Sequence, residues 1–150
     1  MVRRAAREDA GTIAQLLAEL GYPATVEEVE QRLAALGVDD RVLLADDGAG
    51  MAVLHRIPRL AEGDGFVRIT ALVVGRESRQ RGVGQALVAA VEAAARDWEC
   101  TLIEVSSGRR PEREFAHRFY RAAGFSDTAS RSVRYWKRLD KAPLTVHDNT

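Results

Sequence analysis

The segment that most constrains the fold of this chain is ITALVVGRESRQRGVGQAL, which runs from Ile69 to Leu87. It begins as an apolar stretch typical of a buried strand, continues as a polar loop with three arginines in six residues, and reaches Gly82–Gly84 at a helical pattern. Such a turn directs unpaired backbone N–H groups at one spot, where the helix dipole adds about half a positive charge. Glycines let a ligand approach the backbone, and arginines suit phosphate. The segment predicts a phosphate-binding strand–loop–helix unit; the alternative is a solvated basic loop.

Composition is ordinary for a globular domain and argues against a nucleic-acid or membrane partner. The 150 residues suffice for one domain with a real core, and 22 basic side chains balance 22 acidic ones, which gives no support for a nucleic-acid or membrane partner. Cys100 is the only cysteine, so we expect no disulfide within the chain and no metal site. No apolar run approaches the roughly 20 residues of a membrane span, and the charged N-terminus does not resemble a signal peptide. We therefore expect a cytoplasmic protein.

Hydrophobic periodicity and turn residues predict a single domain over residues 1–140, followed by a polar tail at 141–150. Helices are expected around the apolar stripes at 13–20, 26–36 and 83–94, and at 111–123. Strands are expected at 2–6, 41–45, 51–57, 66–74 and 101–106, with two closing strands from 125 onward and at 132–139. The order βααβββαβαββ mixes hairpins with crossover connections and predicts an α+β, or mixed α/β, fold.

Two short motifs resemble the signatures of one enzyme family. Arg79–Gly84 reads RQRGVG and fits the pattern R/Q-x-x-G-x-G/A, with the strand residues LVV at 72–74 at the expected distance before it. Residues 119–125 read FYRAAGF, an aromatic–tyrosine pair shortly before Gly-Phe. In this order and spacing the motifs resemble the GNAT superfamily of N-acetyltransferases, which bind acetyl-coenzyme A. The resemblance covers residues 68–138 and implies a GNAT-like fold, a central mixed, mostly antiparallel sheet flanked by about four helices.

The resemblance implies a role for each matching residue. Main-chain groups at 72–74 would pair with the pantetheine arm as an added strand does, and the backbone amides from Gln80 to Gln85 would hold the pyrophosphate. Tyr120 would lie near the thioester sulfur and protonate the departing thiolate. The residues expected to bind acetyl-CoA are Leu72, Val73, Val74, Arg79, Gln80, Arg81, Gly82, Val83, Gly84, Gln85, Ser107 and Phe119.

The motifs leave the general base open. Family members often carry an acidic residue where this chain has Thr70, which cannot take up a proton at neutral pH, and a glycine where it has Gln80. Glu104 interrupts an apolar strand and is the candidate base, although the alternation of that strand equally suits a solvent-facing carboxylate. His55 and His117 titrate in a useful range, but isolated histidines are more often structural.

Together these residues predict an N-acetyltransferase that moves an acetyl group from acetyl-CoA directly to a primary amine of a small molecule or peptide. Tyr120 would act as the acid, Glu104 is the candidate base, and the N–H of Val74 would meet the carbonyl oxygen. A homodimer is left open. Local acidity slightly favours a small cationic acceptor; the residues concerned are Asp46, Asp47, Glu62 and Asp64.

Two other functions stay open from the sequence. A coenzyme-binding regulatory module without turnover would explain why Thr70 replaces an acidic residue. A Rossmann dinucleotide-binding domain would use Gly82 and Gly84, with Glu104 as a ribose contact 20 residues further on. Leu87 argues against the Rossmann domain, because it occupies the third glycine position, where close packing of helix and strand requires a small residue.

Overall fold

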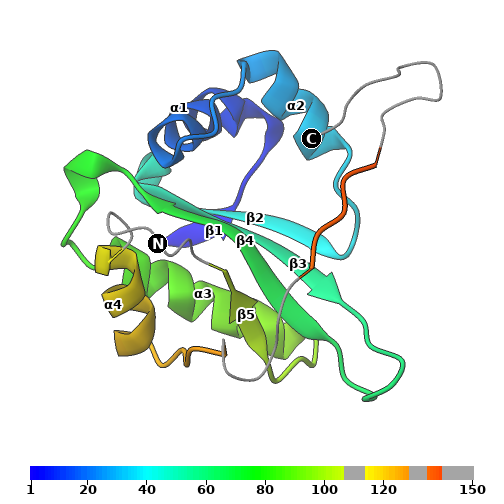
Figure 1. Cartoon of the computed structure of the whole chain (residues 1–150). Helices are drawn as coiled ribbons and strands as arrows, with labels where there is room; N and C mark the ends of the chain where they lie inside the picture. Colours follow the sequence, from blue (N-terminus) through cyan, green and yellow to red (C-terminus); the bar gives the residue numbers. More distant parts are fainter. Residues whose placement is uncertain (107–113, 129–134, 140–150) are drawn as a thin grey trace.

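The computed structural model describes residues 1–106, 114–128 and 135–139. Its five strands form one sheet in the order of the chain (Figure 1). They are β1 (Val2–Arg4), β2 (Asp40–Ala45), β3 (Gly50–Ile57), β4 (Phe66–Val74) and β5 (Ile103–Val105). The first three junctions are antiparallel, whereas β5 runs parallel to β4. A parallel neighbour requires a crossover connection, and helix α3 (Val83–Asp97) supplies it.

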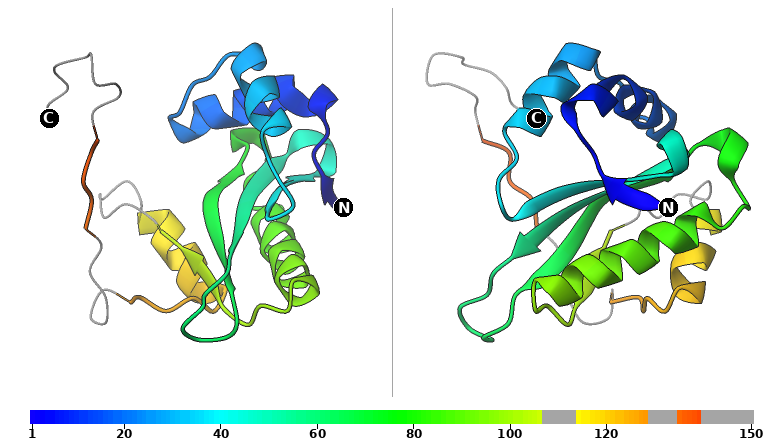
Figure 2. Two further views of the ribbon diagram at one scale, coloured as in Figure 1. Left: turned by 90° about the vertical axis from the view of Figure 1, so that its right-hand side faces the viewer. Right: turned by 180° about the vertical axis from the view of Figure 1, so that it is seen from behind.

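Helices cover both faces of the sheet (Figure 2). Helices α1 (Ala10–Leu20) and α2 (Val26–Ala34) lie together on one face, and α3 lies on the other with α4 (Glu114–Ala122) beside its N-terminal end. Single turns of 3-10 helix form η1 (Arg7–Asp9), η2 (Asp46–Gly48) and η3 (Arg76–Ser78). Because side chains alternate between the faces of a strand, the sheet contributes to two separate cores.

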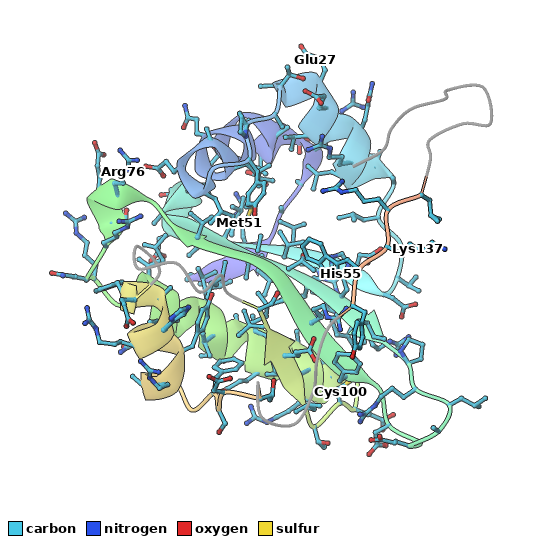
Figure 3. The ribbon with its side chains drawn as sticks, viewed as in Figure 1. Glu27, Met51, His55, Arg76, Cys100 and Lys137 are labelled. Atoms are coloured by element: carbon cyan, nitrogen blue, oxygen red, sulfur yellow. The ribbon has the colours of Figure 1, made fainter. Side chains whose placement is uncertain are left out.

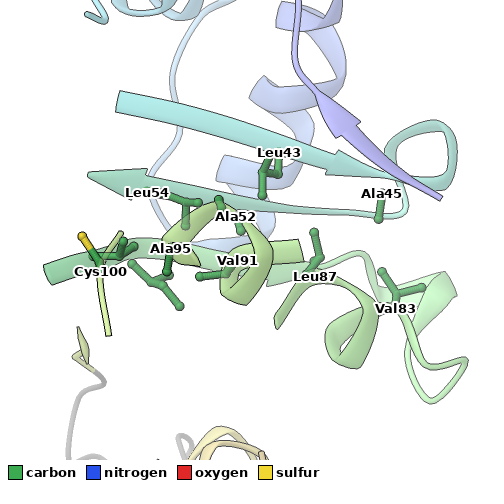
Figure 4. Close-up of a cluster of buried hydrophobic side chains, with 12 residues drawn as sticks. Leu43, Ala45, Ala52, Leu54, Val83, Leu87, Val91, Ala95 and Cys100 are labelled. Carbon is green, nitrogen blue, oxygen red and sulfur yellow. The ribbon is translucent and has the colours of Figure 1, made fainter. Parts of the chain in front are cut away.

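The first core lies between the sheet and α3, as Figure 4 shows, and the second lies under α1 and α2. Leu87 and Val91, one turn apart on α3, are completely buried in the first core. Burying a Leu or Val side chain contributes roughly 1.5–3 kcal/mol, so this stripe fixes α3 against the sheet. The second core consists of Ala10, Ile13, Leu16, Val29, Val42, Leu44, Met51 and Val73.

Local signals mark the ends of the first two helices. The hydroxyl of Thr25 accepts from the N–H of Glu28 at 3.1 Å, while the Glu28 carboxylate accepts from the N–H of Thr25 at 3.0 Å. This reciprocal pair satisfies two backbone donors at the start of α2. Gly21 ends α1 at a φ of 103°, where glycine is favoured over any other residue. These ends agree with the helices that the sequence analysis expected around 13–20 and 26–36.

The described elements follow the order βααβββαβα, and the mixed, mostly antiparallel sheet confirms the expected α+β fold. The same sheet overturns the Rossmann alternative, which requires parallel strands. The strand expected at 101–106 is limited to Ile103–Val105. The helix expected at 111–123 is described from Glu114 to Ala122, and residues 111–113 lie outside the described residues.

The two closing strands predicted after α4 are wrong for the residues that the structure describes. Neither 125–128 nor 135–139 forms a strand, and 129–134 lie outside the described part of the chain. A strand requires a partner for its backbone groups, but the described sheet ends at β5. The large apolar residues of 135–139 also enter no core, because Tyr135, Trp136 and Leu139 are at least 80% exposed.

Candidate active site

Strands β4 and β5 lie side by side over only part of β4. Their parallel pairing joins residues 67–69 to residues 103–105 and stops there. From Ala71 to Val74, β4 stays paired with β3 but has no strand partner on its other side among the described residues. Within the described ranges, the end of β4 therefore presents a free strand edge, to which an extended ligand can add through main-chain hydrogen bonds.

An irregularity in β4 accounts for this divergence. Val53 of β3 faces Ala71, but the next residue, Leu54, faces Ile69, so Thr70 is an extra residue on β4. Such a β-bulge bends its strand and increases the local twist. The bulge directly follows the last β4 residue that pairs with β5, which is where the two strands part.

The hydrogen-bond pattern decides which main-chain groups face the free edge. Gly75 donates its N–H to the carbonyl of Ala49, just before β3, at 2.8 Å. Because successive residues of a strand direct these groups to opposite sides, those of Val74 and Leu72 face away from β3, and those of Val73 face towards it. The sequence analysis expected all three residues to bind a pantetheine arm. The geometry leaves Leu72 and Val74 for that role and assigns the main chain of Val73 to the pairing with β3.

The loop after β4 enters α3 through two residues with a left-handed backbone. Gln80 has a φ of 65°, and Gly82, the N-cap of α3, has a φ of 80°. A Cβ added to Gly82 would meet no atom within 4 Å, so the space beside this backbone is open. No side chain in the described part of the chain caps α3, which leaves the N–H groups of its first turn for a ligand. This geometry suits the pyrophosphate site expected from Gln80 to Gln85.

The loop also carries positive charge that the described residues do not neutralise. Arg76, Arg79 and Arg81 are exposed, and none of them forms an ion pair with another described residue. Their charge has the same sign as the dipole at the start of α3. One hydrogen bond joins the main chain of the loop to α1: the backbone N–H of Arg76 donates to Glu19 Oε1 at 3.3 Å. Figure 3 labels Arg76.

Helix α4 packs through Phe119 against the first turn of α3, close to the end of β4. A Cβ added to Gly84 would lie 3.0 Å from two ring carbons of Phe119 and 3.7 Å from Val74 Cγ2. Gly84 thus makes room for an aromatic ring between α3 and the end of β4, whereas the sequence analysis expected room for a ligand. The half-buried Tyr120 ring packs edge-to-face on Phe119 and on Phe125, with centroid distances of 5.6 and 5.7 Å. These contacts fix the Tyr120 ring between Phe119, which adjoins Gly84, and Phe125.

Glu104, the candidate base of the sequence analysis, is part of an ion pair. Its neighbours Ile103 and Val105 pack against the α3 core, so strand alternation directs Glu104 to the opposite face of the sheet. There its Oε1 lies 2.8 Å from both Nε and Nη2 of Arg68. Ser107, expected to contact the cofactor, lies outside the described residues.

A chain of hydrogen bonds that the sequence analysis missed crosses β2, β3 and β4. Asp40 Oδ1 lies 2.5 Å from His55 Nδ1, and His55 Nε2 lies 3.1 Å from Thr70 Oγ1. The N–H of Gly37 donates to Asp40 at 2.9 Å, and this bond, followed by the contact with His55, lowers the pKa of Asp40. His55 and Thr70 meet only through the register of a bulged hairpin, a feature that no sequence signal marked.

The acidic residues that favoured a cationic acceptor do not gather at one place. Asp46 and Asp47 form the turn before β3, and Glu62 and Asp64 lie in the loop after it, at opposite ends of a strand roughly 26 Å long. Asp46 contacts the N-terminal amine, and Glu62 pairs with Arg59 at 2.9 Å. The structure therefore gives this acceptor preference no support.

Other features of the described residues add no second site. No three His, Cys, Asp or Glu side chains among them are grouped to hold a metal ion, and none of the described helices combines the length and apolar character needed to cross a membrane. Cys100 is buried in the α3 core, with its sulfur 3.6 Å from the carbonyl of Trp98. A hollow of about 270 Å³ lies between α2 and β2, but no β4 residue lines it.

Comparisons with known proteins converge on one family. The family model described as "Acetyltransferase (GNAT) family" matches residues 13–125. A solved structure of a proposed acetyltransferase from Arthrobacter sp. FB24 is 31% identical, with a TM-score of 0.76 over 93% of this chain and 96% of that chain. One from Agrobacterium tumefaciens str. C58 is 21% identical, with a TM-score of 0.79 over 93% and 99%. An aminoglycoside N-acetyltransferase in complex with CoA is 20% identical, with a TM-score of 0.76 over 93% and 95%. No curated protein matches the chain in sequence.

Proposed function

Because the chain belongs to the GNAT acetyltransferase family, we propose that it transfers an acetyl group from acetyl-CoA to a primary amine of a small molecule or peptide. The observation that carries the proposal is the free edge of β4 beside the uncapped N-terminus of α3. An extended, amide-bearing arm requires a strand edge, and a pyrophosphate requires clustered N–H donors and positive charge. This chain offers the two sites consecutively, joined by one loop.

Acetyl-CoA supplies an acetyl group activated as a thioester, and we assign its binding to these two sites. Leu72 and Val74 pair with the pantetheine arm through their main-chain groups. The backbone amides from Gln80 to Gln85 hold the pyrophosphate, and the guanidinium groups of Arg79 and Arg81 add charge beside it. Phe119 closes the end of this site through its contact with Gly84.

Groups at the Val74 end of β4 supply the chemistry of transfer. The N–H of Val74 donates to the thioester oxygen, where negative charge develops. The hydroxyl of Tyr120 protonates the departing thiolate. The amine attacks directly, so the reaction requires no covalent enzyme intermediate, and the buried Cys100 has no part in it.

Ligand-induced stabilisation tests the binding half of the proposal. Acetyl-CoA at ~100 times its Kd stabilises the protein by about 2.7 kcal/mol, which raises Tm, whereas NAD gives no such rise. Gly82→Val abolishes the shift, because a branched side chain fills the open space and is strained at a φ of 80°. Gly63→Val is the matched control: Gly63 has a φ of 79° and open space, but lies in the β3–β4 loop, so the shift remains. A larger shift with NAD than with acetyl-CoA would overturn the proposal.

Release of free thiol measures the transfer half. The amines offered are kanamycin, spermidine, lysine and a short peptide with a free N-terminus, which differ in charge and size. Kanamycin is included because an aminoglycoside N-acetyltransferase shares the fold. Thiol release above the rate with acetyl-CoA alone, for any of these amines, supports transfer. Binding of acetyl-CoA with no release in their presence favours a regulatory coenzyme-binding module.

A further inference from the structure

The chain of hydrogen bonds through Asp40, His55 and Thr70 has no role in the steps above. We propose that these three side chains are the proton relay that deprotonates the attacking amine, an inference that rests on the proposed function. A protonated amine has no lone pair for attack on a thioester, so one proton must leave before the new C–N bond forms. The Thr70 hydroxyl oxygen accepts that proton while its own proton passes to His55 Nε2. Asp40 then stabilises the imidazolium that results.

The location of the relay supports this role. His55 follows Met51 and Val53 at intervals of two residues, and both of these pack in the core under α1 and α2, so His55 lies on the sheet face opposite α3. Thr70, the bulged residue, begins the part of β4 that has no β5 partner among the described residues. Its side chain is exposed at that edge, so a bound acceptor or water can reach it.

The distance along β4 sets how the proton travels. Thr70 precedes Val74 by four residues, which is about 13 Å along an extended strand. An amine placed at the Val74 end is therefore connected to the Thr70 hydroxyl through bound water. From His55 the proton leaves to solvent, because 31% of the His55 side-chain surface is exposed.

The partners of His55 prepare it to accept a proton at Nε2. An ionised Asp40 carboxylate can only accept a hydrogen bond, so the Nδ1 that lies 2.5 Å from it carries the proton of the neutral ring. The lone pair of Nε2 then faces Thr70 Oγ1, whose hydroxyl donates to it. After protonation Nε2 becomes a donor and the hydroxyl turns to accept, so the same contact serves both states.

The charged groups around the relay are compatible with a histidine that gains and loses a proton. Asp40 faces His55 from β2, and Arg68 faces it in the β3–β4 register. The charge of Arg68 is offset by Glu104 of β5, 2.8 Å away. The same ion pair occupies Oε1 of Glu104, the candidate base of the sequence analysis, with two donors of Arg68. The structure thus favours His55 over Glu104 as the group that takes the proton.

Nitrogen-15 NMR of the imidazole ring tests the relay without an acceptor. In the wild-type protein with a neutral His55 ring, we expect the Nδ1–H tautomer. Asp40→Asn shifts the ring towards the Nε2–H tautomer, because its amide NH₂ can donate to Nδ1. Asp39→Asn is the matched control, since Asp39 bonds Arg56 Nε at 2.7 Å and does not contact His55, and it leaves the tautomer unchanged. A wild-type ring that carries its proton on Nε2 overturns the relay.

Kinetics test the relay with the amine of highest turnover among kanamycin, spermidine, lysine and the peptide. His55→Gln and Thr70→Val each lower kcat/KM for that amine by roughly 10²-fold, with the KM for acetyl-CoA unchanged. His55→Gln also removes the decline of kcat/KM towards acidic pH, because the variant has no imidazole to take the proton. Thr70→Ser restores the hydroxyl and recovers activity relative to Thr70→Val. Wild-type rates and pH profiles in both of the first two variants overturn the relay.

These outcomes separate the relay from the proposed function. If acetyl-CoA raises Tm and an amine is acetylated, but the His55 and Thr70 variants behave as wild type, the relay alone fails. If no amine is acetylated, transfer to amines fails, and the tautomer of His55 still decides whether Nε2 can accept a proton. A tautomer with Nε2 protonated then overturns the relay, whereas the Nδ1–H tautomer that depends on Asp40 supports Nε2 as the nitrogen that accepts a proton.

Discussion

At the scale of single residues, Tyr120 combines a packing role with a proposed chemical role, and one substitution separates them. Tyr120→Phe keeps the ring that packs edge-to-face on Phe119 and Phe125 and removes only the hydroxyl. If that hydroxyl protonates the thiolate, kcat falls by roughly 10²-fold while the Kd for acetyl-CoA changes little. Steady-state kinetics together with a thermal shift measure both quantities. Unchanged kcat in the variant would show that Tyr120 only packs.

Gln80 is a second position where one residue can be tested alone. Its φ of 65° lies in the left-handed region, which costs a non-glycine residue about 1 kcal/mol. Gln80→Gly relieves this strain but gives the unfolded chain more freedom, so we expect a net gain of about 0.5 kcal/mol in the free energy of unfolding. Chemical denaturation measures the change.

Arg79 provides the control for Gln80, because the two residues are adjacent but Arg79 has a φ of −68°. Arg79→Gly relieves no strain and adds only freedom to the unfolded chain, so the free energy of unfolding falls by about 0.5–1 kcal/mol. A loss of stability in both variants would contradict the strain assigned to Gln80.

At the scale of elements, the sequence predicts those whose signals are local. The capping box of Thr25 and the apolar stripe of α3 depend on neighbours within one helix, and both are found in the structure. The bulge at Thr70 depends on how β3 pairs with β4, and no local pattern reports that register. The sequence could therefore not predict the contact between His55 and Thr70. Nor could it predict that the main-chain groups of Val73 face β3 while those of Leu72 and Val74 face away from it.

Contact between α3 and α4 gives a prediction at this scale. A Cβ at Gly84 lies 3.0 Å from two Phe119 ring carbons, closer than packed carbon atoms allow, so Gly84→Ala forces the ring to move. Overpacking of this kind lowers the free energy of unfolding by about 1–3 kcal/mol. Phe119→Leu with Gly84→Ala relieves the clash, so the double variant loses less stability than the sum of the single variants. Additive losses in chemical denaturation would show that the ring does not meet the new methyl group.

At the scale of the whole molecule, the order of elements was predictable as far as α4, because each connection has its own turn or capping residues. The two closing strands were not, since a segment with the composition of 132–139 becomes a strand only where another strand accepts its backbone groups. In the candidate site, too, the sequence predicts some features and not others. Tyr120 and the loop expected to bind phosphate were predicted from consecutive residues. The edge of β4 that is free among the described residues exists because β5 pairs with only three β4 residues.

The response of the whole fold to acid depends on carboxylates whose ionised form the folded state stabilises. The bidentate hydrogen bonds from Arg3, followed by the N–H of Ala6, lower the pKa of Asp9 from 3.8 to about 2. The unfolded state therefore binds this proton more readily, so the stabilisation is complete above about pH 4 and is lost as pH falls towards 2. Its size is no more than about 1 kcal/mol, because Arg3 is half exposed and screened by solvent.

Asp9→Asn removes that stabilisation at every pH. The variant is less stable than the wild type at pH 7, and its free energy of unfolding declines less steeply between pH 4 and pH 2. Denaturant titrations at intervals of half a pH unit measure both effects. Glu8→Gln is the control, because the neighbouring Glu8 forms no ion pair with a described residue, so this variant keeps the wild-type slope. Parallel curves for the wild type and Asp9→Asn would mean that the contacts of Asp9 with Arg3 and Ala6 do not stabilise the fold, and that the acid sensitivity arises elsewhere.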